Sequence, residues 1–399
     1  MTSLGDLDLL ARLVAFDTTS ATRRPTRPLG DFVCDYLDHP GIRMSRFDCG
    51  GDQENLWFET GPESTGDGEG LLLCGHVDVV PATEPEWTGD PFILRIEDDR
   101  VIGRGACDMK GFDAIAINLL RERALAGGGS TPLGLLLTCN EEIGTVGAGR
   151  FAGQWGDRPL PRRTIVGEPT SGRAVRGHKG HLSISIQVGG RGCHTGFPNR
   201  GVNAIERTIP VLQAIHGLRV AMVGERTATS DLFPETPHPV LTVASIDAGS
   251  AINVMPDRST LRVGVRLLPG QPASGFLPTL ASAIEAAGVP VTLLDGLEHP
   301  IPDGATSLAE DACVITATND TPSYAIDSSS PFLAEVRDLS GEDDGGGVNF
   351  GTDAGRLVPL GCESVVWGPG DISVAHRPDE WISILEMQAY RERLGRLGR

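Results

Sequence analysis

The stretch LLLCGHVDVV, residues 71–80, has the pattern of a buried strand that ends in two polar side chains, His76 and Asp78. Side chains two positions apart on a strand point to the same face, so we expect this imidazole and this carboxylate to be neighbours. The carboxylate can accept the imidazole N–H and leave the other ring nitrogen free to bind a metal. The two groups can equally well satisfy each other at a strand end, so the rest of the sequence must decide between these interpretations.

Two further apolar strands end in acidic residues. PLGLLLTCNEE (132–142) ends in Glu141 and Glu142, and RRTIVGEPT (162–170) contains Glu168. Three buried strands joined by helices predict an α/β fold, with a mostly parallel sheet that is covered by helices. Ligands bind at the carboxyl ends of the strands in such sheets, so we expect a site at this edge.

From about residue 175 the pattern changes to alternating strands and helices of an α+β type, as in HLSISIQVGG (181–190). A chain of 399 residues is long enough for a domain that carries an insertion. We therefore predict a catalytic domain in two parts, interrupted by a smaller α+β domain, with the boundaries 1–176, 177–297 and 298–399. Other periodic stretches predict helices at 5–17, 29–38, 111–126, 201–218, 272–287 and 378–397, and a hairpin at 93–102.

Charge and cysteine usage limit the partners and the compartment. The net charge of −19 argues against nucleic acid and against an anionic membrane surface. No apolar stretch approaches the ~20 residues that span a bilayer, and Asp6 and Asp8 stand where a signal peptide would carry positive charge. The eight cysteines show no C-x-x-C spacing, so we expect reduced thiols in a cytoplasmic protein.

Acidic and imidazole side chains gather at the predicted sheet edge. Besides the strand ends above, the candidates are Asp108 in GRGACDMKG and His376 in DISVAHRPDE. Burying several carboxylates together is costly without cations, and two divalent metals about 3.5–4 Å apart would neutralise them. Histidine and carboxylate ligands without thiolates suit Zn²⁺, with Co²⁺ or Mn²⁺ as substitutes.

On these motifs the sequence resembles the di-zinc metallopeptidase family that includes aminoacylases, carboxypeptidases, desuccinylases and acetylornithine deacetylases. The motifs span nearly the whole chain in family order: CGHVDVVP, Trp87 with DPF, GRGACDMKG, CNEEIG, VGEPT, CHTGFPNRGVNAI and AHRPDE. The resemblance implies that His76 and Glu168 bind one metal. It implies that Glu142 and His376 bind the other and that Asp108 bridges the two.

The same resemblance implies the catalytic roles. Asp78 would orient His76, and Glu141 would be the general base. His194 in the inserted domain would donate to the oxyanion in the active site of a partner subunit, because the inserted domains of this family form homodimers. The family also has a cis peptide after the bridging aspartate, which here is the Asp108–Met109 bond.

Within the family, the segments DMKGF, RGHKGHLS, RLLPG, LEHPIP (297–302) and GPGDISVAHRPDEW are most similar to acetylornithine deacetylases. This implies removal of the acetyl group from N2-acetyl-L-ornithine, a step of arginine biosynthesis. Arg266 would bind the substrate α-carboxylate through bidentate geometry, and Asn253 and Thr352 are further substrate-binding candidates. One departure concerns Asp353, which stands where the family pattern has a glutamate.

Other functions stay open from the sequence. The substrate can be that of an acetylcitrulline deacetylase, an aminoacylase, a desuccinylase or a dipeptidase, since these share the fold. A catalytically inactive binding homologue is a further alternative, although intact ligands and Glu141 speak against it. Arg266 can be a solvated strand residue and Asn253 a turn residue, and His178, Lys179 and His181 fit a pocket or a polar hinge equally well.

Overall fold

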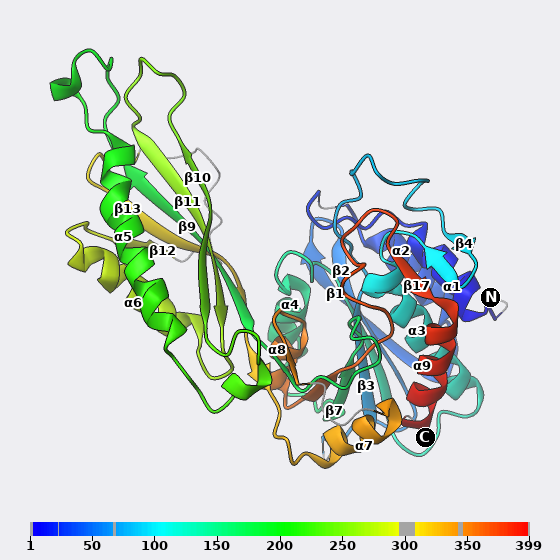
Figure 1. Ribbon diagram of the computed structural model, residues 1–399. Helices are drawn as coiled ribbons and strands as arrows, with labels where there is room; N and C mark the ends of the chain where they lie inside the picture. Colours follow the sequence, from blue (N-terminus) through cyan, green and yellow to red (C-terminus); the bar gives the residue numbers. More distant parts are fainter. Residues whose placement is uncertain (1–2, 23, 67–68, 295–307, 342–345, 398–399) are drawn as a thin grey trace. The chain divides into compact units, whose positions relative to one another are not determined.

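The computed structural model describes residues 3–22, 24–66, 69–294, 308–341 and 346–397, and the chain divides into two compact units (Figure 1). Unit 1 comprises Met1–Gly177, Ile326–Gly347 and Thr352–Arg399, and unit 2 comprises His178–Ala325 and Val348–Gly351. The LEHPIP segment at 297–302 lies outside the described residues.

Unit 1 is built on a six-stranded sheet in the order β1-β2-β6-β3-β7-β16. The strands are β1 (Ile42–Gly50), β2 (Gln53–Thr60), β3 (Leu71–His76), β6 (Leu133–Thr138), β7 (Arg163–Val166) and β16 (Glu363–Val366). The last four run parallel, whereas β2 pairs antiparallel with β1 and β6. Every residue of β3 and β6 is buried, as their continuous apolar sequences predict. The expected mostly parallel α/β sheet is therefore confirmed.

Helices cover both faces of this sheet. The core on one face includes residues of α1 (Asp6–Val14), α2 (Arg27–Tyr36), α3 (Gly111–Leu125), α7 (Pro331–Ser340) and α9 (Ile384–Leu397). On the opposite side, α4 (Val146–Trp155) packs against β1 and β2, and α8 (Ala354–Leu357) packs against α4 and β16 (Figure 1). None of the helices in the described residues has the length and apolar character needed to cross a membrane.

A second, three-stranded sheet in unit 1 has the order β17-β5-β4. It contains β4 (Arg95–Glu97), β5 (Arg100–Ile102) and β17 (Trp381–Ser383). The hairpin expected at 93–102 corresponds to β4 and β5. The helix expected from 378 begins only at Ile384, because Trp381–Ser383 pairs with β5 instead.

Unit 2 is a five-stranded sheet in the order β10-β11-β9-β13-β12, with helices packed on one face. Its elements are β9 (Gly180–Gly189), α5 (Ala204–Val223), β10 (Val240–Ala248), β11 (Arg258–Leu267), α6 (Ala273–Ala286), β12 (Thr292–Leu294) and β13 (Cys313–Thr321). Burial alternates along β9 and β11, which is the expected pattern of a sheet with one covered face. Single helical turns occur at Pro198–Arg200 and Ser230–Leu232 in unit 2 and at Val358–Leu360 in unit 1.

The sequence predicts that the chain returns to the first unit at residue 298, but the structure places this return later. Cys313–Thr321 forms β13, which pairs antiparallel with β9 inside the sheet of unit 2, and unit 1 resumes only at Ile326. Three two-residue strands, β8 (Gly177–His178), β14 (Tyr324–Ala325) and β15 (Gly347–Val348), form a third sheet where the chain passes between the units. The pairing of β13 is non-local, so the local apolar pattern did not reveal it.

Candidate metal centre

The parallel pairing of β3 with β6 and β7 places their carboxyl ends at one edge of the sheet. The register sets His76 opposite Thr138 and Cys74 opposite Val166. Glu168, two residues beyond Val166, therefore comes level with His76. Both side chains are buried, with exposures of 1% for His76 and 4% for Glu168.

Asp108 reaches this edge from a kinked turn, Ala106–Lys110, that precedes α3. One carboxylate oxygen lies 3.1 Å from Nε2 of His76, and the other lies 3.2 Å from Nε2 of His376. Burial by itself would raise the pKa of the Asp108 carboxyl, but the hydrogen bonds with His376 and His76 lower it below its usual range. The expected cis peptide bond between Asp108 and Met109 is present.

His376 joins the cluster from the segment that follows β16. Its backbone is left-handed, with φ of 59°, and its Nε2 lies 3.2 Å from the Glu142 carboxylate. The hydrogen bonds to Asp108 and Glu142 raise the pKa of His376 to about 11 in the metal-free protein.

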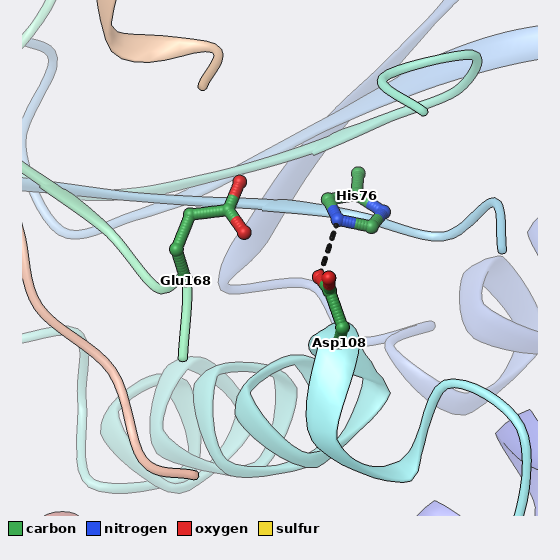
Figure 2. Close-up of side chains that lie close together, drawn as sticks. All are labelled: His76, Asp108 and Glu168. Atoms are coloured by element: carbon green, nitrogen blue, oxygen red, sulfur yellow. Dashed lines mark hydrogen bonds and ion pairs between the residues drawn. The ribbon is translucent and has the colours of Figure 1, made fainter. Parts of the chain in front are cut away.

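The ligand atoms of these five residues form two groups. His76, Asp108 and Glu168 make one group, and Asp108, Glu142 and His376 make the other, with the ligand atoms of each group within 4.8 Å of one another. Figure 2 shows the first group, in which His76 and Asp108 face each other and Glu168 points toward them from a separate segment. Asp108 belongs to both groups, which is the arrangement that a bridging carboxylate requires.

The donor set fits a pair of divalent cations. It contains two imidazoles and three carboxylates and no thiolate, which suits Zn²⁺, Co²⁺ or Mn²⁺. Burial, and then the neighbouring Asp108, raises the pKa of Glu142 to about 6 and that of Glu168 well above its usual range. Like charges gathered in a buried site have this effect, and a cation between them removes it.

Glu141 lies beside the two groups but belongs to neither. Burial, and then the nearby Glu168 carboxylate, raises the pKa of Glu141 well above its usual range. A carboxyl group with these neighbours is suited to taking up a proton. The adjacent glutamates therefore have different environments, because Glu142 contacts His376 directly.

Asp78 differs from its expected role. Its carboxylate lies 3.8 Å from Nδ1 of His76, and this nitrogen instead donates to the backbone oxygen of Asp78 at 2.9 Å. The two carboxylate oxygens accept the backbone N–H groups of Glu141 at 3.0 Å and Glu142 at 3.2 Å. Asp78 thus orients His76 through its main chain, and its side chain holds the segment that carries both glutamates.

In unit 2, His194 and Asn253 lie on two adjacent loops. The N–H of Thr195 donates to the Asn253 oxygen at 3.1 Å, and the N–H of Met255 donates to the Cys193 oxygen at 2.8 Å. His194 and Asn253 are both exposed. The structure therefore brings these two residues together within unit 2, as exposed groups on its surface.

Arg266 lies in β11, opposite His181 of β9. Burial, and then the nearby Arg266, lowers the pKa of Lys179 to about 8 and that of His181 to about 4. Within the part of the chain that the structure describes, no carboxylate forms an ion pair with Arg266. This half-buried guanidinium is consequently suited to binding an anionic group.

Thr352 lies in the core of unit 1, just before α8. Its side chain is fully buried, with 0% exposure, and its hydroxyl accepts the N–H of Ala354 at the start of α8. The next residue, Asp353, is also buried and accepts the hydroxyl of Thr138 at 2.6 Å. Burial raises the pKa of Asp353 to about 6. Both residues therefore support the sheet edge from within the core.

Arg104 and Glu380 also lie at the site, although the sequence motifs did not single them out. Glu380 accepts the backbone N–H groups of Cys107 and Asp108, and it pairs with Arg104. Both residues belong to quoted motifs, GRGACDMKG and HRPDE. Their presence inside two motifs that meet at the site is the sequence feature from which they could have been predicted.

The comparisons with known proteins agree with this geometry. The model of peptidase family M20/M25/M40 matches residues 72–397. An acetylornithine deacetylase of Myxococcus xanthus is 33% identical over 384 residues, which is 95% of this chain and 92% of that protein. An acetylornithine deacetylase of Proteus mirabilis is 33% identical over 331 residues, 82% of this chain and 78% of that protein.

Two solved structures show the same fold. The metallo-carboxypeptidase Sso-CP2 from Sulfolobus solfataricus has a TM-score of 0.78 at 18% identity and covers 99% of both chains. The YXEP protein of Bacillus subtilis, a dinuclear metal-binding peptidase, has a TM-score of 0.64 at 14% identity over 98% of this chain and 96% of that one.

Proposed function

This chain is a member of peptidase family M20/M25/M40 and a hydrolase of amide bonds, and we propose that it converts N2-acetyl-L-ornithine into L-ornithine and acetate. The observation that carries the proposal is the pair of ligand groups that share Asp108. The identity to acetylornithine deacetylases over most of the chain supports the choice of substrate. The product ornithine fits a role in arginine biosynthesis.

In the proposed site, His76 and Glu168 would hold one cation, Glu142 and His376 would hold the other, and Asp108 would serve both. Two Zn²⁺ ions fit this donor set, and Co²⁺ or Mn²⁺ can replace them. When bound, such a pair would acidify the attacking water and polarise the acyl oxygen of the substrate.

Glu141 acts as the general base in this proposal. Its carboxylate lies in the same buried cluster without belonging to either ligand group, so it is free to take the proton of the attacking water and to deliver it to the leaving amine. His194 supplies a hydrogen bond to the oxyanion. Arg266, which has no acidic partner in the described residues, binds the α-carboxylate.

The geometry of unit 2 supports a homodimer. The backbone N–H of Gly190 donates to the backbone oxygen of Asp257. The chain therefore leaves β9 beside Arg258, the first residue of β11, and the His194 loop follows at this end of the sheet. Arg266 lies near the other end of β11. Eight positions along a strand span roughly 27 Å at about 3.4 Å per residue. Only three bonds separate the acetyl carbon from the carboxylate carbon of an N-acetyl amino acid, so one unit 2 cannot place both residues on one substrate. If Arg266 binds the α-carboxylate, we infer that His194 serves a second copy of the chain.

We also propose a cytoplasmic location. All eight cysteines are free, and seven of them are buried. Thiols in this state are typical of a reducing compartment.

Removal and return of the metal test the centre. An imidazolium cannot bind a metal, and the hydrogen bonds to Asp108 and Glu142 raise the pKa of His376 to about 11, so we expect metal uptake at pH 7 to release a proton from it. Lowering the pH should therefore weaken metal binding. We expect titration calorimetry in two buffers of different ionisation enthalpy to show this release, up to two Zn²⁺ per chain, and loss of activity on chelation.

A matched control for the titration is His216→Ala, which alters an exposed histidine of α5 and should leave proton release unchanged. Full activity without bound metal, or metal uptake without proton release, would contradict the proposed centre.

A substrate panel tests the reaction. After metal reconstitution, kcat/KM is measured for N-acetylornithine, N-acetylcitrulline and N-acetylmethionine, and we expect the first to be highest. A higher value for another compound would reassign the substrate within the family. Hydrolysis of none of a wider set of N-acyl amino acids would favour a binding homologue instead.

A further inference from the structure

Glu380 is a buried carboxylate directly behind the metal-bridging residue. Its exposure is 1%, and one of its oxygens accepts the backbone N–H of Cys107 at 2.9 Å and that of Asp108 at 3.0 Å. The other oxygen accepts a hydrogen bond from Arg104 at 2.6 Å. None of these contacts involves an atom that would bind metal, so the proposed reaction leaves Glu380 without a role.

Arg104 connects Glu380 to two other segments of unit 1. The guanidinium is fully buried, with 0% exposure. It donates to the Pro81 oxygen at 2.9 Å and stacks over the Trp87 ring at 5.1 Å. The network thus joins the WTGDPF, GRGACDMKG and HRPDE motifs.

The turn that carries Asp108 needs such a support. The turn is irregular, since Asp108 and Met109 have non-helical backbone angles. The first N–H groups of a helical segment have no partner within that segment, so those of Cys107 and Asp108 need an acceptor from elsewhere. Hydrogen bonds from N–H groups to a carboxylate are stronger than those between neutral groups. Glu380 therefore holds the main chain where the Asp108 side chain must direct one oxygen to His76 and the other to His376.

We propose that Glu380, held by Arg104, is the positioning residue of the bridging carboxylate. It fixes the main chain of Asp108 so that the side chain can serve both metal-binding groups. A buried ion pair is weak evidence for stability, because desolvation offsets its attraction. Its contact with the shared ligand gives the pair a function instead. The inference rests on the proposed function only for the presence of the metals.

The test is Zn²⁺ titration of Glu380→Gln without substrate. Because Asp108 is shared, we expect both sites to weaken, each by roughly 10- to 100-fold, as is typical when a partner of a ligand is lost. Glu142→Ala should weaken only one site. In the loaded enzyme, kcat should fall while KM stays near its wild-type value.

Asp379→Asn is the matched control, since Asp379 is the preceding residue and its carboxylate accepts from Thr88 and Arg95, neither of which belongs to a metal-binding group. It should bind both metals as the wild type does. A Glu380→Gln protein with a lower Tm but unchanged affinities would overturn the inference, because the network would then be structural only.

A second variant removes both charges, Arg104→Met with Glu380→Leu. Without an unpaired buried charge it should fold, yet both sites should stay weak, because Cys107 and Asp108 lose their acceptor. Wild-type affinity in this variant, or loss of the fold in both variants, would contradict the positioning role. Inactivity of the wild type toward acetylated amino acids would refute the proposed function alone, because the titration uses no substrate.

Discussion

Glu141 and Glu142 are adjacent in sequence and yet face different partners. Glu142 contacts His376 and shares a ligand group with Asp108, whereas Glu141 belongs to neither group. Their backbone N–H groups are both held by Asp78, so one carboxylate fixes the main chain from which the two side chains diverge.

We expect Glu141→Ala to retain both metals and lose about 10²–10⁴ in kcat, the usual effect of removing a general base. Glu142→Ala should instead bind one metal less tightly. Metal content by elemental analysis and kcat on N-acetylornithine distinguish the two variants, and each serves as the control of the other. Exchanged phenotypes would reverse the assignment of base and ligand.

Strand periodicity did not predict the contact between His76 and Asp78 correctly. The strand pattern placed the two side chains on one face and predicted a direct imidazole–carboxylate bond. β3 ends at His76, so Asp78 no longer follows the alternation of the strand. Its backbone oxygen accepts from His76, and its carboxylate turns to the segment after β6.

The junction of β7 and α3 depends on a glycine. A Cβ on Gly167 would lie 2.1 Å from ring atoms of Phe112, which α3 places against the end of β7. Glu168 follows immediately, so the close approach of this ring and the strand sets the position of a metal ligand. This packing links the VGEPT motif to the DMKGF motif.

Gly167→Ala should therefore destabilise the protein by about 1–3 kcal/mol, the usual cost of overpacking a core, and weaken the metal group that contains Glu168. Thermal unfolding of the metal-free protein and Zn²⁺ titration measure these effects. Gly153→Ala is the control in the same unit, because Gly153 is exposed in α4 with open space around it. This control should be neutral or more stable by about 0.5–1 kcal/mol. Equal Tm values for the two variants would refute the packing argument.

Elements with strong local patterns were predicted well, and elements defined by distant partners were not. The apolar run at 71–77 corresponds to β3, and the helix expected at 111–126 corresponds to α3 at Gly111–Leu125. β17 was mistaken for the start of the last helix, because its strand pairing with β5 involves residues about 280 positions away. β13 was assigned to the wrong unit for the same reason.

The placement of His194 and Arg266 at opposite ends of unit 2 leads to a test of the proposed homodimer. A C₂ dimer would join Glu141 of one chain to His194 of the other. Glu141→Ala and His194→Ala dimers should then both be nearly inactive. Mixing them after dissociation should make about half of the dimers hybrid, each with one intact site, and restore about a quarter of wild-type activity.

A mixture of Glu141→Ala with Glu142→Ala is the control for this experiment. Both residues belong to unit 1 of the same chain, so every site of that hybrid carries a defect, and no activity should return. If verified subunit exchange between Glu141→Ala and His194→Ala restored nothing, His194 would serve its own chain or have no catalytic role.

The sequence by itself determined the chemistry of this protein. Two imidazoles and five carboxylates at or near the ends of apolar segments predicted a metal site, and the order of the motifs predicted the family. These features are local, so hydrophobic pattern and residue type were enough to identify them. Only the tertiary structure decided that Asp78 holds the two glutamates, that Glu380 supports Asp108, and that β13 belongs to unit 2. Each of these depends on contacts between residues far apart in the chain, whose free energy exists only once the sheets have formed.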